Sequence, residues 1–208
     1  IIAGSDPVVI AIIGSLGILA LAIFGTEGFN RQSLVAFVSV ILALGLILIL
    51  SKLFTGFAHL SGLESEEAAY LLSLGNLRIN LQGLLLSGII IGALGVLDDI
   101  IISQVSLVKE LSKTNPEMKS AAMFKTAMHV GTDHINAIVN TLFLAYAGVS
   151  LPLLVLFTIY NSPEMTAGSI VNRELFATEI VRTLVGSIAL VLSVPIATYL
   201  AVKTFCKK

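Results

Sequence analysis

The chain alternates between long apolar stretches and short polar connections along its 208 residues. Five of the stretches are long enough to cross a hydrocarbon core of about 30 Å, which takes about 20 apolar residues in an α-helix. They cover roughly residues 7–25, 34–57, 81–108, 135–159 and 180–202. The pattern predicts an all-α polytopic membrane helix bundle of about five transmembrane helices, in a single transmembrane domain over residues 1–208.

Prolines and helix-capping residues add detail to this picture. Pro152 interrupts the fourth stretch, which is either one helix kinked at that point or two short helices. The capping pattern Asn115-Pro116-Glu117 predicts a short helix to about Met128. Gly131 is expected to end that helix before the fourth span begins. A second short helix, lying at the membrane surface, is predicted at Ser65-Glu66-Glu67.

Composition agrees with a membrane protein. Hydrophobic residues make up 56% of the chain, and the formal net charge of −1 excludes a polybasic nucleic-acid-binding surface. The single cysteine, Cys206, excludes an intrachain disulfide.

Because the chain opens at Ile1-Ile2 rather than Met, we expect it to be the remainder of a longer protein. Its first apolar stretch lacks the basic start of a signal peptide, so it is interpreted as a span of the mature protein. The lipid bilayer is the expected partner, and no cofactor or metal ion is expected.

Basic residues gather in three segments that share one side of a five-span bundle. These residues are Arg31, Lys109, Lys113, Lys119, Lys125, Lys203, Lys207 and Lys208. The opposite side carries Arg78, Arg173 and Arg182, with Glu64, Glu66 and Glu67 nearby. Since short cytoplasmic loops are enriched in lysine and arginine, the chain is predicted to start outside and to end in the cytoplasm.

Asp98 and Asp99 are the only charged residues in the third apolar stretch. One aspartate at the centre of a membrane helix costs about 2.5–3.5 kcal/mol on insertion scales, so such residues usually face protein or water and carry function. Neighbouring carboxylates titrate in coupled steps, and such a pair can take up and release a proton. We therefore predict that Asp98 and Asp99 bind protons or ions. The alternative is that they only hydrogen-bond to facing helices and stabilise their packing.

Helical spacing places small and polar residues beside these acids. One stripe of the third span carries Gly88, Gly92, Gly95, Asp99, Ser103 and Ser106. The fourth span offers a polar face at three- and four-residue steps, and the predicted polar partners of the acids are Ser103, Asn136, Asn140, Asp133 and His134. Asp133 has an ordinary alternative role, capping a helix N-terminus. Glu179 and Arg182 are expected to pair across one helical turn.

Other functions for the acids remain as alternatives. An intramembrane hydrolase holds its two acids on separate helices, whereas adjacent residues of one helix point about 100° apart, so no enzyme is predicted. A divalent metal site made from Asp98, Asp99, Asp133 and His134 would have to join groups two to three helical turns apart in depth. The main alternative to transport is a non-catalytic membrane assembly or scaffold protein.

Three stretches of the chain resemble the YibE/F-like family of bacterial membrane proteins. They are GIIIGALGVLDDIIISQVSLVKEL, NPEMKSAAMFKTAMHVGTDHINAIVNTLFLAYAGVSLPLLVLF and ATEIVRTLVGSIALVLSVPIAT. The resemblance implies a multi-pass protein of the bacterial cytoplasmic membrane. It also implies that the full form carries an upstream membrane helix and an extracytoplasmic segment. It implies no biochemical activity.

A second resemblance suggests a mechanism. The string GALGVLDDIIISQVSLVKEL is similar to the Asp-Asp helix of RND-type proton-driven exporters and their Sec accessory relatives. By that likeness Asp98 and Asp99 match the proton-relay acids, and the five predicted spans match the last five helices of one transporter half. The lysine that such exporters place against the acids has no evident counterpart in this chain. We therefore predict a proton- or ion-coupled half-transporter, acting as a homo-oligomer or with a paired homologous half on an unknown small-molecule or ion substrate.

Overall fold

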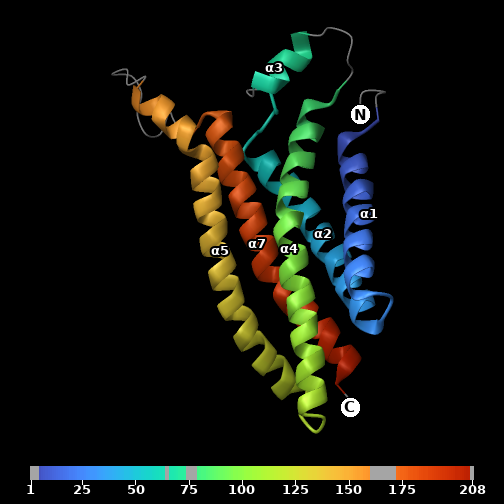
Figure 1. Cartoon of the computed structure of the whole chain (residues 1–208). Helices are drawn as coiled ribbons and strands as arrows, with labels where there is room; N and C mark the ends of the chain where they lie inside the picture. Colours follow the sequence, from blue (N-terminus) through green and yellow to red (C-terminus); the bar gives the residue numbers. More distant parts are fainter. Residues whose placement is uncertain (1–4, 64–65, 74–78, 160–171, 207–208) are drawn as a thin grey trace.

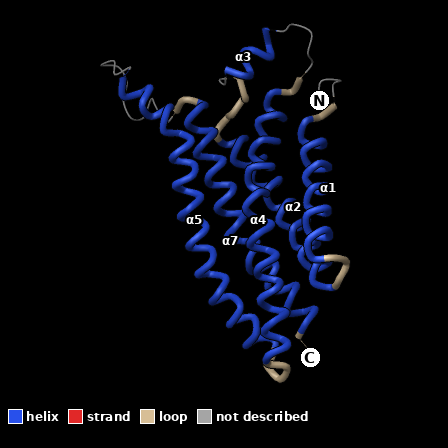
Figure 2. The backbone as a smooth tube through the Cα atoms, in the orientation of Figure 1, coloured by secondary structure: helices blue, strands red, loops and turns tan. Residues whose placement is uncertain are grey.

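The computed structural model describes residues 5–63, 66–73, 79–159 and 172–206, and within these ranges all regular structure is helical (Figure 2). Figure 1 shows the helices of the bundle: α1 (Pro7–Glu27), α2 (Arg31–Phe57), α3 (Glu66–Ser73), α4 (Leu81–Thr114), α5 (Ser120–Ile159) and α7 (Glu174–Phe205). Five of them, all except α3, are long and apolar enough to cross a membrane. The predicted all-α membrane bundle is confirmed.

Local side-chain capping explains where three of the long helices begin. The Asp6 carboxylate accepts a hydrogen bond from the Val8 amide (2.8 Å), directly before Pro7 at the first helical position. Asn30 accepts from the amides of α2, and Asn80 accepts from the Gly83 amide of α4 (3.0 Å). Each cap satisfies amide groups that the first turn of a helix leaves without a partner.

Helices α2, α4 and α7 form the centre of the bundle. In their most apolar windows 44%, 44% and 56% of the residues are buried, against 22% in α1 and 11% in α5. α7 packs against α4, α2 and α5, whereas α1 packs against α4 and α2. The buried positions of α7 recur every four residues, as one face of a helix requires: Val181, Val185, Ala189, Ser193, Ala197 and Ala201.

The outward faces of the bundle are also apolar. Ile18 and Leu21 of α1 are 70% and 79% exposed, and Leu144 of α5 is 72% exposed. Large apolar side chains spread over several long helices exceed what a water-soluble surface normally displays. The protein is therefore a multi-pass membrane protein whose outward faces contact lipid.

The connections between helices separate into two ends. Figure 1 places the α1–α2 and α4–α5 connections and the C-terminus at one end, which we call the basic end. The starts of α1, α4 and α7 lie at the other end with α3, which we call the α3 end. Arg31, Lys113, Lys119 and Lys203 belong to segments at the basic end. This grouping is the one on which the predicted orientation depends, and the orientation itself stays a prediction.

The structure corrects two local predictions. Asn115 ends α4 rather than starting a helix, and the Met118 amide turns back to the Asn115 carbonyl (3.0 Å). Gly131 does not break a helix, because α5 continues from Ser120 to Ile159. Gly131 is instead a close-packing position, since a Cβ atom there would lie 2.7 Å from Val194 Cγ1.

Several other boundaries differ from prediction or lie outside the described ranges. α4 runs six residues past the predicted 108, and α7 begins six residues before the predicted 180.

α5 is one helix with Pro152 inside it, so the alternative of two short helices is wrong. The end of α5, orange in Figure 1, turns away from α7. The short helix predicted at 65–67 is confirmed as α3, whereas its place at the membrane surface stays a prediction. Ser65 lies outside the described residues, as do Glu64, Arg78, Lys207 and Lys208.

Candidate functional site

Asp98 and Asp99 lie halfway along α4. At a rise of 1.5 Å per residue, each end of this helix is about 25 Å from the pair, so the acids lie in the middle of a candidate membrane span. Asp98 is half-buried, and its Oδ1 atom is shielded from solvent with no hydrogen-bond partner among the described residues. Asp99 is exposed on the surface of the single chain. Neither carboxylate is therefore held in a saturated hydrogen-bonded cluster.

The predicted stripe of small and polar residues forms an open face of α4. Gly88, Gly92, Gly95, Asp99 and Ser103 are all exposed. A Cβ atom added at any of these three glycines would meet nothing within 4 Å among the described residues. The glycines therefore do not serve close packing inside this chain, in contrast to Gly131. An exposed carboxylate at this depth requires cover by protein or water rather than lipid.

The polar residues of α5 make no hydrogen bond to the acids in the described part of the chain. Asn136, Asn140 and His134 are exposed, and their side chains make no hydrogen bond within the described ranges. Asp133 is also exposed, and its Oδ2 atom lies 3.7 Å from His129 Nδ1 one turn back along α5. Among the described residues, no three His, Cys, Asp or Glu side chains come close enough to hold a metal ion. The single chain therefore places the acid pair beside the small residues of α4, but the polar residues of α5 make no hydrogen bond to the acids.

A buried amide, rather than the predicted polar face, joins α5 to α4. Gln104 Nε2 donates to the Ala127 carbonyl of α5 (2.9 Å) and to Thr198 Oγ1 of α7 (2.8 Å). Gln104 is only 2% exposed, so these two bonds satisfy an amide that would otherwise be costly to bury. This junction lies beside Gly131 and joins α4 to α5 and α7 in the half of α4 toward the basic end.

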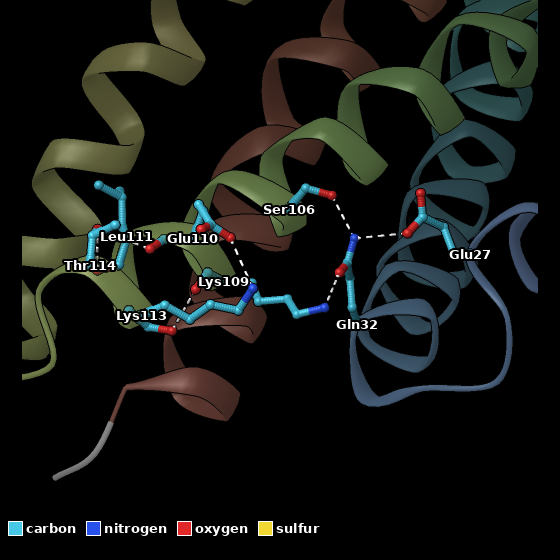
Figure 3. A network of polar contacts seen from close by, with 9 residues as sticks. Glu27, Gln32, Ser106, Lys109, Glu110, Leu111, Lys113 and Thr114 are labelled. Atoms are coloured by element: carbon cyan, nitrogen blue, oxygen red, sulfur yellow. Dashed lines mark hydrogen bonds and ion pairs between the residues drawn. The ribbon is translucent and has the colours of Figure 1, made fainter.

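A polar network continues the stripe toward the basic end (Figure 3). Gln32 of α2 is 7% exposed, and its Nε2 atom donates to Ser106 Oγ of α4 (2.6 Å) and to Glu27 Oε2 of α1 (3.2 Å). Lys109 Nζ donates to Gln32 Oε1 (2.6 Å). These side chains come from three helices: Glu27 from α1, Gln32 from α2, and Ser106 and Lys109 from α4. Gln32 lies between the other three.

This network lies on the same stripe of α4 as Asp99. Ser106 is seven residues after Asp99, almost two full turns, which corresponds to about 10.5 Å along the helix axis. Ser103 lies between them on the same face. Polar groups therefore follow α4 from the middle of the helix to the carboxylate of Glu27 and the ammonium group of Lys109 at the basic end.

A sequence model described as YibE/F-like protein matches residues 1–207. The chain belongs to the YibE/F-like family. No curated protein and no solved structure matches it. The family membership confirms the first resemblance drawn from the sequence, and the likeness to RND-type exporters stays a prediction.

In this YibE/F-like protein, sequence reasoning missed Gln32 and Glu27 as part of the polar path. Gln32 and Ser106 are 74 residues apart, so no local spacing connects them. The sequence pattern marks Lys109 only as an orientation signal, whereas in the structure its ammonium group also donates to Gln32. The only local signal is a glutamine in the first turn of an apolar span, two residues after an asparagine cap.

Proposed function

We propose that this YibE/F-like protein is half of a proton- or ion-coupled membrane transporter, with Asp98 and Asp99 as its proton-binding acids. The proposed role is transport rather than catalysis. The observation that carries the proposal is an adjacent carboxylate pair deep in the membrane, on a face that the chain's own described helices leave open. A second copy of the chain, or a paired homologous half, would cover that face and bring polar groups to the acids.

The polar path below the acids supports the same proposal. Protons move along chains of hydroxyl, amide and carboxylate groups, and Ser103, Ser106 and the Gln32 network supply such groups toward the basic end. If the predicted orientation holds, this path leads to the cytoplasm. The exposed α5 residues Asn136 and Asn140 would then serve as polar partners only after assembly.

Proton exchange by the acids can be measured without knowing the substrate. Infrared difference spectra of the protein in liposomes, recorded as the pH is changed, report the carbonyl band of a protonated carboxyl group. We expect a band that titrates and shifts in D₂O, is lost in Asp99→Asn and is altered in Asp98→Asn. Glu110→Gln is the matched control, because Glu110 is an exposed carboxylate paired with Lys113 near the end of α4.

The same variants test coupling. Asp99→Asn should abolish any activity that depends on a pH gradient while the protein remains inserted in the membrane. A carboxyl band that does not respond to pH or D₂O, or full coupling in Asp99→Asn, would reject the assignment.

The open glycine face also favours a second candidate, a non-catalytic assembly protein whose acids serve packing alone. Thermal stability separates the two. Packing acids, once changed to asparagine, should lower the melting temperature strongly at every pH, whereas relay acids should leave it nearly unchanged.

A further inference from the structure

A cavity of about 390 Å³ lies between α4 and α7 at the α3 end of the bundle. Most of its wall is apolar and comes from Leu81, Leu84 and Leu85 of α4 and Leu175 of α7. Gly88 completes the α4 wall. The volume falls within the range of about 300–1,000 Å³ that is typical of small-molecule sites. The cavity is therefore large enough for a compact organic molecule.

A carboxylate clamp forms one side of this cavity. Glu174, at the start of α7, accepts hydrogen bonds from Ser61 Oγ (2.6 Å) and from the Gly62 amide. Gly62 has a φ angle of +76°, and a Cβ atom there would lie 2.7 Å from the Leu81 carbonyl oxygen. Only glycine fits this close approach, so the clamp holds the turn after α2 against the start of α4.

The charged groups in the described lining of the cavity do not balance. Its described lining holds two carboxylates, Glu174 and Glu179, but only one cation, Arg182, which leaves one negative charge. Glu179 Oε1 and Arg182 Nη2 are 3.6 Å apart, and the two side chains are 23% and 30% exposed. Glu179 Oε2 has no hydrogen-bond partner among the described residues. A carboxylate accepts several hydrogen bonds, so Glu174 also retains acceptor capacity.

We propose that this cavity binds a monovalent organic cation with a compact apolar body. The ammonium group would offset the unbalanced carboxylate charge, and the apolar body would lie against the leucines of α4 and α7. An anion would add to the two carboxylates, and a neutral molecule would leave one of them uncompensated. This site goes beyond the proposed proton exchange and does not require it, because the lining residues do not include Asp98 or Asp99.

Binding is tested with the full chain in lipid nanodiscs, using tritiated 2-phenylethylamine as the probe and empty nanodiscs as the background. Propylbenzene has the same shape but no charge, and phenylacetate carries the opposite charge. We expect saturable binding of the amine, little competition from propylbenzene and none from phenylacetate. Glu179→Gln should weaken binding about ten-fold, as loss of a charged hydrogen-bond acceptor predicts. Glu110→Gln should not affect it.

Two glycines on one helix give a matched steric test. A Cβ atom at Gly88 or at Gly92 meets nothing within 4 Å, so both positions accept a larger side chain. Only Gly88 lines the cavity. Gly88→Leu should therefore abolish amine binding, whereas Gly92→Leu, one turn along α4, should retain it.

Asp99→Asn separates this proposal from the proposed function and should leave amine binding unchanged. Loss of binding in Asp99→Asn would place the amine at the acid pair and overturn the cavity assignment. Equal binding of propylbenzene, tighter binding of phenylacetate, or equal effects of the two glycine variants would also overturn it. A second cavity of about 290 Å³, lined by Phe143, Tyr146 and Ala147, shares Glu179. Loss of binding in Ala147→Leu but not in Gly88→Leu would assign the cation to this second cavity and overturn the proposal.

Discussion

Gly131→Ala should destabilise the bundle, although alanine favours a helix. The added Cβ atom would lie 2.7 Å from Val194 Cγ1 and 2.9 Å from both side-chain Nε2 and Oε1 of Gln104. Overpacking of this kind costs about 1–3 kcal/mol. Moving Gln104 aside would also weaken its bonds to Ala127 and Thr198, at about 1 kcal/mol for each net hydrogen bond.

Helix propensity opposes these costs, because replacing glycine by alanine inside a helix gains at most about 1 kcal/mol. The net expectation is a loss of about 2 kcal/mol. Gly17→Ala is the matched control, since Gly17 lies inside α1 with nothing within 4 Å of an added Cβ atom, so only the gain remains. Thermal unfolding of both variants in the same detergent measures the difference. A Gly131→Ala protein as stable as the wild type would refute the claim that α5 approaches α4 and α7 closely at this position.

Two further predictions concern the polar contacts at the ends of the bundle. Gln32→Leu removes the acceptor of Lys109 and the donor to Ser106, so it should lower the free energy of unfolding by about 1–3 kcal/mol in the same assay. Breaking the exposed Lys113–Glu110 pair with Glu110→Gln should change that free energy by less than about 0.5 kcal/mol. Equal effects of the two variants would contradict the buried role of Gln32. Glu174→Ala should release the turn at Ser61 and Gly62, so amide hydrogen exchange should become faster at these residues but not at the Asn80 cap of α4. An unchanged exchange rate at Gly62 would show that the clamp does not hold the turn.

The candidate acids were predictable because their signal is one-dimensional. Two adjacent charges inside an apolar stretch need no knowledge of the fold to stand out, and both lie halfway along α4, a helix long and apolar enough to cross a membrane. The grouping of α4 residues on one stripe was equally accessible, since it follows from the helical repeat. Whether a neighbouring helix covers that stripe was not accessible, because a residue's periodicity says which face it lies on but not what faces it.

Gly131 illustrates the opposite case. Followed by Thr132 and Asp133, it has the local pattern of a helix end, and glycine is a common helix-terminating residue. The helix nevertheless continues through Gly131, and glycine is needed there because the close approach of Val194 and Gln104 leaves no room for a side chain. A glycine that permits close packing and a glycine that ends a helix have the same sequence signature.

The amino-acid sequence alone determined the class of this protein, its five spans and the position of its acids, because the hydrocarbon core imposes length and polarity on each segment separately. Only the tertiary structure decided the contacts between segments: the Gln104 junction, the Gln32 network, the Glu174 clamp and the open face of α4. These depend on which helices become neighbours and at what depth their side chains meet. That choice is made by packing between spans far apart in the chain, and no local pattern encodes it.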